Sequence, residues 1–311
     1  MSFKKLLFFV LVTMMWLVTN SHSFENKIIL KIEKDIITTV DIKNEAKYLS
    51  ALNPKIIELD STKIFEISKN SLVREKIKKI ELLKNSKKVE LNNDFLEKII
   101  QTRYNSLGLK TKDEFIKYLK NFDVEISTVV KKIEIEALWN QLIFFKFSKN
   151  IKIDKEKLLK NIQVNNNLIE KKELLLKEIL FNVDEASNFD EKYNEIKKSI
   201  TDTGFENAAS LYSISDSSKT GGDLGWISEN SLNPKIKKAL LGLNLKEYSS
   251  PINLSGGFLI LQISDIKIIK EEIDTEKELK KAINVETNRQ LNQFSNVYFN
   301  KAKKEISIHE T

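Results

Sequence analysis

Glycine and proline are concentrated in one part of this chain, and this distribution constrains the fold more than any other feature. The protein has 8 glycines and 3 prolines in 311 residues, and seven of the glycines lie between Gly204 and Gly257. Pro234 and Pro251 fall in the same region. Because glycine reaches positive φ angles at little cost, it gathers where a chain turns tightly. The sequence therefore predicts a turn-rich module there and a mostly helical protein around it.

The first residues have the layout of a secretory signal peptide. Lys4 and Lys5 precede an apolar run from Leu6 to Val18, and small residues follow up to a cleavage point after Ser23. The run is shorter than the roughly 20 residues that span a bilayer, which favours cleavage over an uncleaved anchor. We assign residues 1–23 to the signal and expect an exported, periplasmic protein without a stable membrane anchor after cleavage.

The composition argues against several kinds of site. The chain has no cysteine, so it can form neither a disulfide framework nor a lipid-modified cysteine. Of the 2 histidines, His22 falls in the signal and His309 lies near the end, so we expect no metal site and no cofactor. The net charge is +7, with lysines spread along predicted helices beside glutamates. This pattern indicates solvated helix faces more than a nucleic-acid surface, and we expect no nucleic-acid partner.

Residues 24–165 are predicted to form a helical unit that opens with a short hairpin. The hairpin occupies residues 27–40, where apolar residues alternate loosely. Asp41 is placed at the N-cap of the first helix. Apolar residues then recur at helical spacing in further segments that begin near Ser61, Asn93, Thr111, Asp123 and Asp154.

Two features near the ends of this unit bear on packing and binding. Phe144, Phe145 and Phe147 could bind clients if exposed, but a position in the core is the usual one for such residues. A last helix, at 274–308, carries one narrow apolar stripe that is too thin to fold alone. We expect that helix to pack on the N-terminal unit, so that residues 170–268 are an insertion.

The inserted module reads as strand, helix, helix, loop, helix, strand, strand. The strands are expected at 173–181, 248–253 and 257–266. Ser213–Ile227 is expected to be a turn-rich loop. This order indicates an α+β domain with a small antiparallel sheet. Its Gly-Gly-Asp-Leu-Gly run lacks the ending of a phosphate-binding loop and the spacing of a dinucleotide fingerprint.

Three motifs in this module carry a resemblance to a known family. They are Gly-Gly-Asp-Leu-Gly-Trp at 221–226, the run at 237–252 that ends Tyr-Ser-Ser-Pro-Ile, and Gly-Phe-Leu-Ile-Leu-Gln-Ile at 257–263. In this order and spacing, residues 173–268 resemble a parvulin-type (PpiC-like) peptidyl-prolyl isomerase domain. The surrounding layout is similar to that of SurA-like periplasmic chaperones, although these usually carry two parvulin domains.

The resemblance implies a site whose expected polar groups have changed. Active members of the family carry histidines where this chain has Glu178 and Leu259. The Cys/Asp position of the loop corresponds to Asp216, or to Ser215 if the alignment slips by one. No catalytic residue can therefore be assigned here. A buried Glu178 would be costly unless it is protonated, bonded to serine or aspartate donors, or able to reach solvent at a strand edge.

The apolar part of the family's site is better preserved. The resemblance places Leu232 and Ile236 in a cleft that grips proline, with Phe258 nearby, and we predict these three as substrate-binding residues. An X–Pro bond prefers trans by only about 0.5–1 kcal/mol but crosses a barrier of about 18–20 kcal/mol. Catalysis therefore needs a pocket that desolvates and twists the amide, without a nucleophile.

Two functions remain open. The first is an exported SurA-like chaperone that binds unfolded envelope or outer-membrane proteins through apolar grooves. The second is an active prolyl isomerase that accelerates X–Pro steps in exported proteins. A purely structural envelope scaffold is possible but has no motif behind it.

Overall fold

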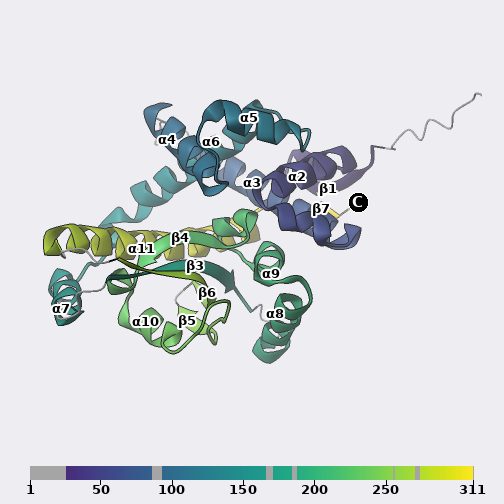
Figure 1. Cartoon of the computed structure of the whole chain (residues 1–311). Helices are drawn as coiled ribbons and strands as arrows, with labels where there is room; N and C mark the ends of the chain where they lie inside the picture. Colours follow the sequence, from purple (N-terminus) through teal and green to yellow (C-terminus); the bar gives the residue numbers. More distant parts are fainter. Residues whose placement is uncertain are drawn as a thin grey trace, which may run out of the picture.

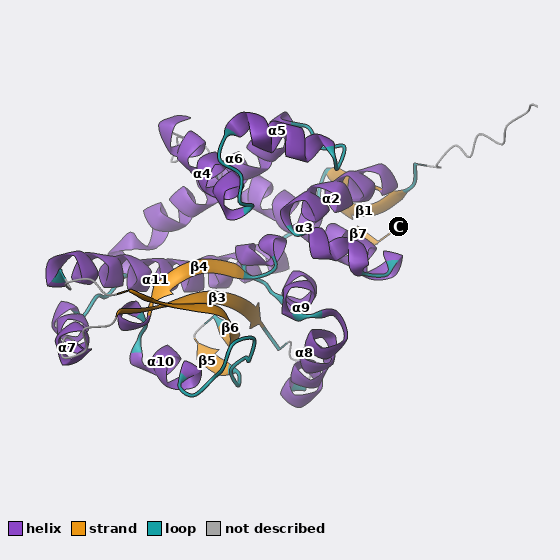
Figure 2. Ribbon diagram, in the orientation of Figure 1, coloured by secondary structure: helices purple, strands orange, loops and turns teal. Residues whose placement is uncertain are grey.

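The computed structural model describes residues 26–85, 93–165, 171–183, 188–254, 256–269 and 274–310 (Figure 1). The predicted signal at 1–23 and its cleavage point lie outside the described residues. Within the described ranges, no helix is both long and apolar enough to cross a membrane. The predicted mixture of helices and sheet is confirmed, and Figure 2 shows that the upper part of the molecule is largely helical.

The two ends of the described chain meet in a small antiparallel sheet. Strands β1 (Ile28–Ile32) and β2 (Asp35–Thr38) form the predicted hairpin, and β7 (Ile308–Glu310) pairs with the other edge of β1. The last strand was not predicted, because three residues carry too little periodicity to be recognised. It also corrects the expected helix at 274–308, which ends at Glu305 as α11 (Thr275–Glu305).

The first helix begins earlier than Asp41 predicted. Helix α2 (Thr39–Leu52) has Thr38 at its N-cap, and the Thr38 hydroxyl accepts a hydrogen bond from the Asp41 backbone N–H. The Asp41 carboxylate in turn accepts from the Thr38 N–H at 2.8 Å. Asp41 is thus the third residue of the helix and the acidic half of a capping box. A threonine that ends a strand was the signal that the sequence reading missed.

The predicted helices of the N-terminal unit are present. They are α3 (Ser61–Lys84), α4 (Asn93–Ser106), α5 (Lys112–Lys120), α6 (Ile126–Phe147) and α7 (Lys155–Asn165), and two short helices that were not predicted, η1 (Pro54–Glu58) and η3 (Ser148–Asn150), lie among them. Helices α2 to α6 share a core that includes Tyr48, Ile100, Phe115, Leu119 and Ile133.

Helix α11 crosses the molecule and packs on both α6 and α7. Trp139 of α6 is fully buried, stacks near Tyr298, and donates its indole N–H to Ser295 Oγ at 2.8 Å. Leu158 and Ile162 of α7 pack on Ala282 of α11. These contacts cover the narrow stripe of α11. The division of the chain into domains remains a prediction.

The three clustered phenylalanines do not share one environment. Phe147 stacks on Phe294 of α11 with ring centroids 5.1 Å apart. Phe144 and Phe145 are 55% and 56% exposed. The expectation that all three are core residues is therefore wrong for Phe144 and Phe145, because α11 covers only the face of α6 that carries Phe147.

The module contains one antiparallel sheet in the order β4-β3-β6-β5 (Figure 2). Its elements are β3 (Lys171–Phe181), α8 (Phe189–Thr203), α9 (Phe205–Tyr212), η4 (Asp216–Thr220), β4 (Asp223–Ser228), η5 (Glu229–Ser231), α10 (Pro234–Leu240), β5 (Ile252–Leu254) and β6 (Gly257–Ile269). Alternate residues of β3 and β6 pack on α10 on one face and on α8 and α9 on the other.

The stretch Ser213–Ile227 contains more regular structure than a turn-rich loop. It holds the short helix η4 and most of β4, which pairs with β3 from Glu173↔Ser228 to Lys177↔Asp223. The glycines concealed this strand, because Gly in a strand interior weakens the β pattern. At Gly222 (φ +83°) an added Cβ would overlap the Glu178 carbonyl oxygen and press on Ala209.

We predict that Gly222→Ala destabilises the protein more than Gly242→Ala does. Both glycines have positive φ, +83° and +81°, so both substitutions incur the left-handed strain of about 1–2 kcal/mol. Only position 222 adds a steric clash, since nothing lies within 4 Å of a Cβ at 242. We expect an additional loss of at least about 2 kcal/mol, measured by urea unfolding. Equal losses for the two variants would contradict this account of the turn.

Candidate functional site

The strand pairing brings the two positions of the missing histidines onto one face of the sheet. β3 lies between β4 and β6, and Glu178 pairs directly with Leu261. Leu259, two residues away on β6, pairs with Leu180. Because side chains alternate along a strand, Glu178 lies on the same face as Leu180, Leu259 and Leu261. Glu178 and Leu259 are therefore near neighbours in the sheet.

Two serine hydroxyls hold the carboxylate of Glu178. Ser215 Oγ and Ser217 Oγ donate hydrogen bonds to Glu178 Oε1 at 2.6 and 2.8 Å. Burial raises the pKa of Glu178, and these two hydrogen bonds offset only part of that effect. β3 is a central strand, so Glu178 does not lie at an edge of the sheet, and its side chain is half-buried.

The backbone of the same loop is pinned to β3. The Glu178 N–H donates to the Gly222 carbonyl at 2.8 Å, and the Ile214 N–H donates to the Leu180 carbonyl at 2.7 Å. Ser213 Oγ accepts a further hydrogen bond from the Leu180 N–H. Residues 213–222, which we call the clamp loop, are thereby fixed on the strand that carries Glu178.

The carboxylate of Asp216 is paired with basic side chains of the N-terminal unit. This carboxylate forms an ion pair with Lys78 Nζ of α3 at 2.5 Å and lies 3.6 Å from the guanidinium of Arg74. Burial by itself would raise the pKa of Asp216, but the charges of Lys78, Arg74 and Lys219 outweigh it and hold the pKa well below its usual range. Asp216 is therefore ionised and engaged with the N-terminal helices.

Further contacts attach the clamp loop to the N-terminal unit. Arg74 donates to the carbonyl oxygens of Ser213 and Ile214. Lys219 pairs with Glu136 of α6 at 2.6 Å. These contacts join residues more than 80 positions apart in the chain. No pattern in the sequence pairs such distant charges, so sequence reasoning missed this part of the site.

The three predicted substrate-binding residues lie in two places. Leu232 and Ile236 are 5% and 7% exposed and pack in one cluster with Leu259. Phe258 lies on the opposite face, where its ring stacks near Phe181 and Phe189. The structure therefore joins Leu232 and Ile236 with Leu259 and separates them from Phe258. Their role in binding substrate remains a prediction.

The described residues contain no group of three histidine, cysteine, aspartate or glutamate side chains that could hold a metal ion. The side chains gathered at this site provide hydrogen bonds, charge and apolar surface.

Comparison with known proteins identifies the module. The sequence model of the family described as "Rotamase: PPIC-type PPIASE domain" matches residues 176–265. These residues are a PpiC-type domain. The match includes Glu178, the clamp loop and Leu259, and it confirms the parvulin resemblance.

Relatives of known name match stretches of the chain. The periplasmic chaperone PpiD of Haemophilus influenzae is 36% identical over 75 residues, which are 24% of this chain and 12% of that protein. Chaperone SurA of Nitrosospira multiformis is 41% identical over 59 residues, 19% of this chain and 13% of the relative. Foldase protein PrsA of Oceanobacillus iheyensis is 27% identical over 146 residues, 44% of each. The matches span less than half of each relative.

Solved structures also align with the chain. A crystal structure of such an isomerase domain covers 32% of this chain at 23% identity and a TM-score of 0.28. A chain from work on PEB4 and a second SurA-like chaperone of Campylobacter jejuni covers 92% of this chain at 16% identity and a TM-score of 0.35. These scores are too low to carry an argument about arrangement or function.

We predict that Glu178→Gln changes how stability depends on pH. The raised pKa means that folded Glu178 keeps its proton above the ordinary value of 4.5. The free energy of unfolding of the unaltered protein therefore falls as pH rises from 4.5 through the raised pKa. The variant lacks this loss. Its free energy of unfolding, relative to that of the unaltered protein, should therefore rise between pH 4.5 and the raised pKa and stay higher above it, as measured by urea unfolding from about pH 4 to pH 8. A difference that does not vary with pH, or that reverses sign, would contradict burial of the charge.

We also predict that Asp216→Asn destabilises the protein by about 2–3 kcal/mol, because it leaves the charge of Lys78 buried without its partner. The Lys78 side chain is only 5% exposed, whereas Asp216 is 36% exposed. Adding Lys78→Met should restore more than half of the loss. The control is Asp123→Asn, which removes one partner of a pair with Lys47 where Asp123 is 80% exposed, at a cost below about 1 kcal/mol. Similar losses at positions 216 and 123 would disprove the importance of the buried pair.

Proposed function

We propose that this protein is an exported chaperone that holds unfolded polypeptides, and that its PpiC-type domain contributes a binding surface with little or no isomerase activity. One observation carries the proposal: the polar groups at the family's site already form hydrogen bonds or ion pairs with other residues of the protein. Glu178 accepts from two serines of the clamp loop, and Asp216 is paired with Lys78 and Arg74.

Polar groups that already have partners are poorly suited to lowering the barrier to rotation about an X–Pro bond. A catalyst must stabilise the twisted amide more strongly than the planar one. Here Leu259 offers no polar atom at one histidine position, and it is 5% exposed. At the other position, Glu178 Oε1 already accepts two hydrogen bonds from the clamp loop. Leu232 and Ile236 are packed in the core of the domain, which leaves little open apolar surface at these residues.

Exposed apolar side chains elsewhere support client binding. Phe144 and Phe145 lie side by side in sequence on α6, and both are more than half exposed. On the PpiC-type domain, Leu241 is 77% exposed and Leu245 is 52% exposed. Apolar side chains of this size can bury matching side chains of an unfolded polypeptide.

The proposed location is the periplasm, and the proposed clients are unfolded envelope proteins, including those of the outer membrane. The signal-like segment at 1–23 supports export. The relative named periplasmic chaperone PpiD supports this compartment, and the relatives named as chaperones support a chaperone role.

An active prolyl isomerase is the second candidate, and the family match over residues 176–265 favours it. In that case the domain would accelerate slow X–Pro steps during folding of exported proteins. The two candidates differ in whether the chain changes a rate or only binds.

Two assays on the mature chain separate the candidates. We predict that equimolar protein suppresses aggregation of an unfolded outer-membrane barrel, measured by light scattering. We also predict that it leaves the isomerisation rate of proline tetrapeptides close to the uncatalysed one, for several residues before proline.

The double variant Phe144→Ser/Phe145→Ser should weaken suppression, whereas Leu83→Ser, at an α3 residue that is 67% exposed, should not. Undiminished aggregation with the unaltered protein would sink the chaperone proposal. A clear rate enhancement on the tetrapeptides would establish the second candidate.

A further inference from the structure

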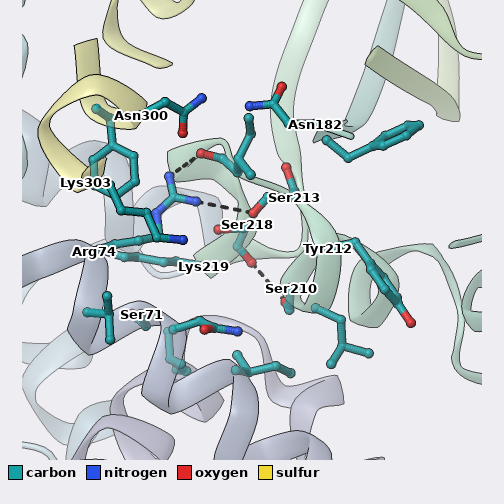
Figure 3. A pocket seen from close by; sticks show the side chains of 18 of the residues that line it. Ser71, Arg74, Asn182, Ser210, Tyr212, Ser213, Ser218, Lys219, Asn300 and Lys303 are labelled. Carbon is teal, nitrogen blue, oxygen red and sulfur yellow. Dashed lines mark hydrogen bonds between the residues drawn. The ribbon is translucent and has the colours of Figure 1, made fainter. Parts of the chain in front are cut away.

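A cavity of about 380 Å³ lies where three distant parts of the chain meet. Its walls come from α2 and α3, from the PpiC-type domain at the end of β3 and around the clamp loop, and from the C-terminal half of α11. Figure 3 shows Asn182 and Asn300 pointing toward each other across this space, with Arg74 below them. A cavity of this size accommodates a small ligand or a few residues of an extended peptide.

The charge of the lining is of one sign. Four cationic side chains line the cavity, namely Arg74, Lys192, Lys219 and Lys303, and the described lining includes no aspartate or glutamate. Arg74 and Lys219 are held by Asp216 and Glu136, which lie outside the lining. An anionic group in the cavity would therefore meet positive charge without repulsion from a facing carboxylate.

Part of the polar lining has no partner within the protein. Lys192 pairs with Glu195 at 3.1 Å on an exposed surface. Lys303 makes no ion pair with any residue that the structure describes, and the side-chain amides of Asn182 and Asn300 make no hydrogen bond within those ranges. An asparagine amide offers both a donor and an acceptor, which is the complement of a peptide group. A lysine ammonium offers three donors, which suit a carboxylate.

We propose that this cavity binds a carboxylate of an extended polypeptide, with Lys303 facing the carboxylate and Asn182 and Asn300 bonding the adjacent peptide groups. The carboxylate comes from the carboxyl terminus of the chain or from an acidic side chain. Apolar residues of the lining, such as Val73, Ile214 and Phe299, would contact the neighbouring aliphatic side chain. The inference rests on the proposed chaperone function only in assuming that the bound polypeptide is an unfolded client. Binding of a short peptide can be measured without any client.

The test is fluorescence anisotropy with three fluorescein-labelled octapeptides of glycine and serine that end in leucine. The first has a free terminal carboxylate, the second is amidated, and the third is amidated with a glutamate before the leucine. We expect the amidated peptide to bind at least about tenfold more weakly than the first, because it lacks the charge-assisted contact. Tight binding of the third peptide would assign the carboxylate to a side chain, and weak binding would assign it to the chain terminus.

Variants on one helix provide the matched comparison. Lys303→Gln should weaken binding of the free acid by about fivefold, and Asn182→Ala should weaken all bound peptides. Lys280→Gln, at an α11 lysine whose side chain is 73% exposed and which lies outside the cavity lining, should change nothing.

Two results would overturn the proposal: equal binding of all three peptides, or displacement of the free acid by inorganic phosphate as effectively as by unlabelled peptide. If the protein fails to suppress aggregation but still binds the peptides in a carboxylate-dependent way, the chaperone proposal is rejected and the proposed carboxylate site is supported.

Discussion

The buried ion pair between Lys78 and Asp216 is the contact on which the arrangement of the site depends. The Lys78 side chain is only 5% exposed, and burying its charge costs several kcal/mol unless a partner such as Asp216, at 2.5 Å, satisfies it. Asp216 sits between Ser215 and Ser217, whose hydroxyls both bond Glu178. Consequently the position of α3 determines the position of the loop, and the loop determines the surroundings of Glu178.

Local patterns were sufficient to predict most of the elements and the antiparallel sheet, but not the order of its strands. The cluster of glycines located the module, and the family resemblance singled out Glu178 and Leu259, which the pairing of β3 with β6 places on one face. The strand β4 was missed because Gly225 interrupts its apolar pattern. The segment is recognisable as a strand only through its pairing with β3. β7 was missed for a related reason, since three residues become a strand only through their pairing with β1.

The sequence could not predict which face of each helix is covered by another element. Phe144 and Phe147 belong to the same helix and have the same chemistry, yet only Phe147 is stacked on α11. Arg74 and Lys78 are one helical turn apart on α3, a spacing that is equally typical of a solvated face. Their partners lie 138 to 140 residues away. Sequence periodicity describes one element at a time, so it identifies a stripe without identifying what lies on it.

The same contacts also fix how the PpiC-type domain is attached to the N-terminal helices. A buried ion pair contributes less to stability than well-packed apolar residues would, and it defines one geometry because alternatives leave a charge unpaired. The contacts of Arg74, Lys78 and Glu136 with residues 213–219 therefore act as a fixed joint between the N-terminal helices and the PpiC-type domain. The cavity beside that joint takes its walls from both parts and from α11, so its shape depends on the joint. The joint therefore fixes both the surroundings of Glu178 and the walls of the cavity, which are the two places where the proposed binding role can be tested.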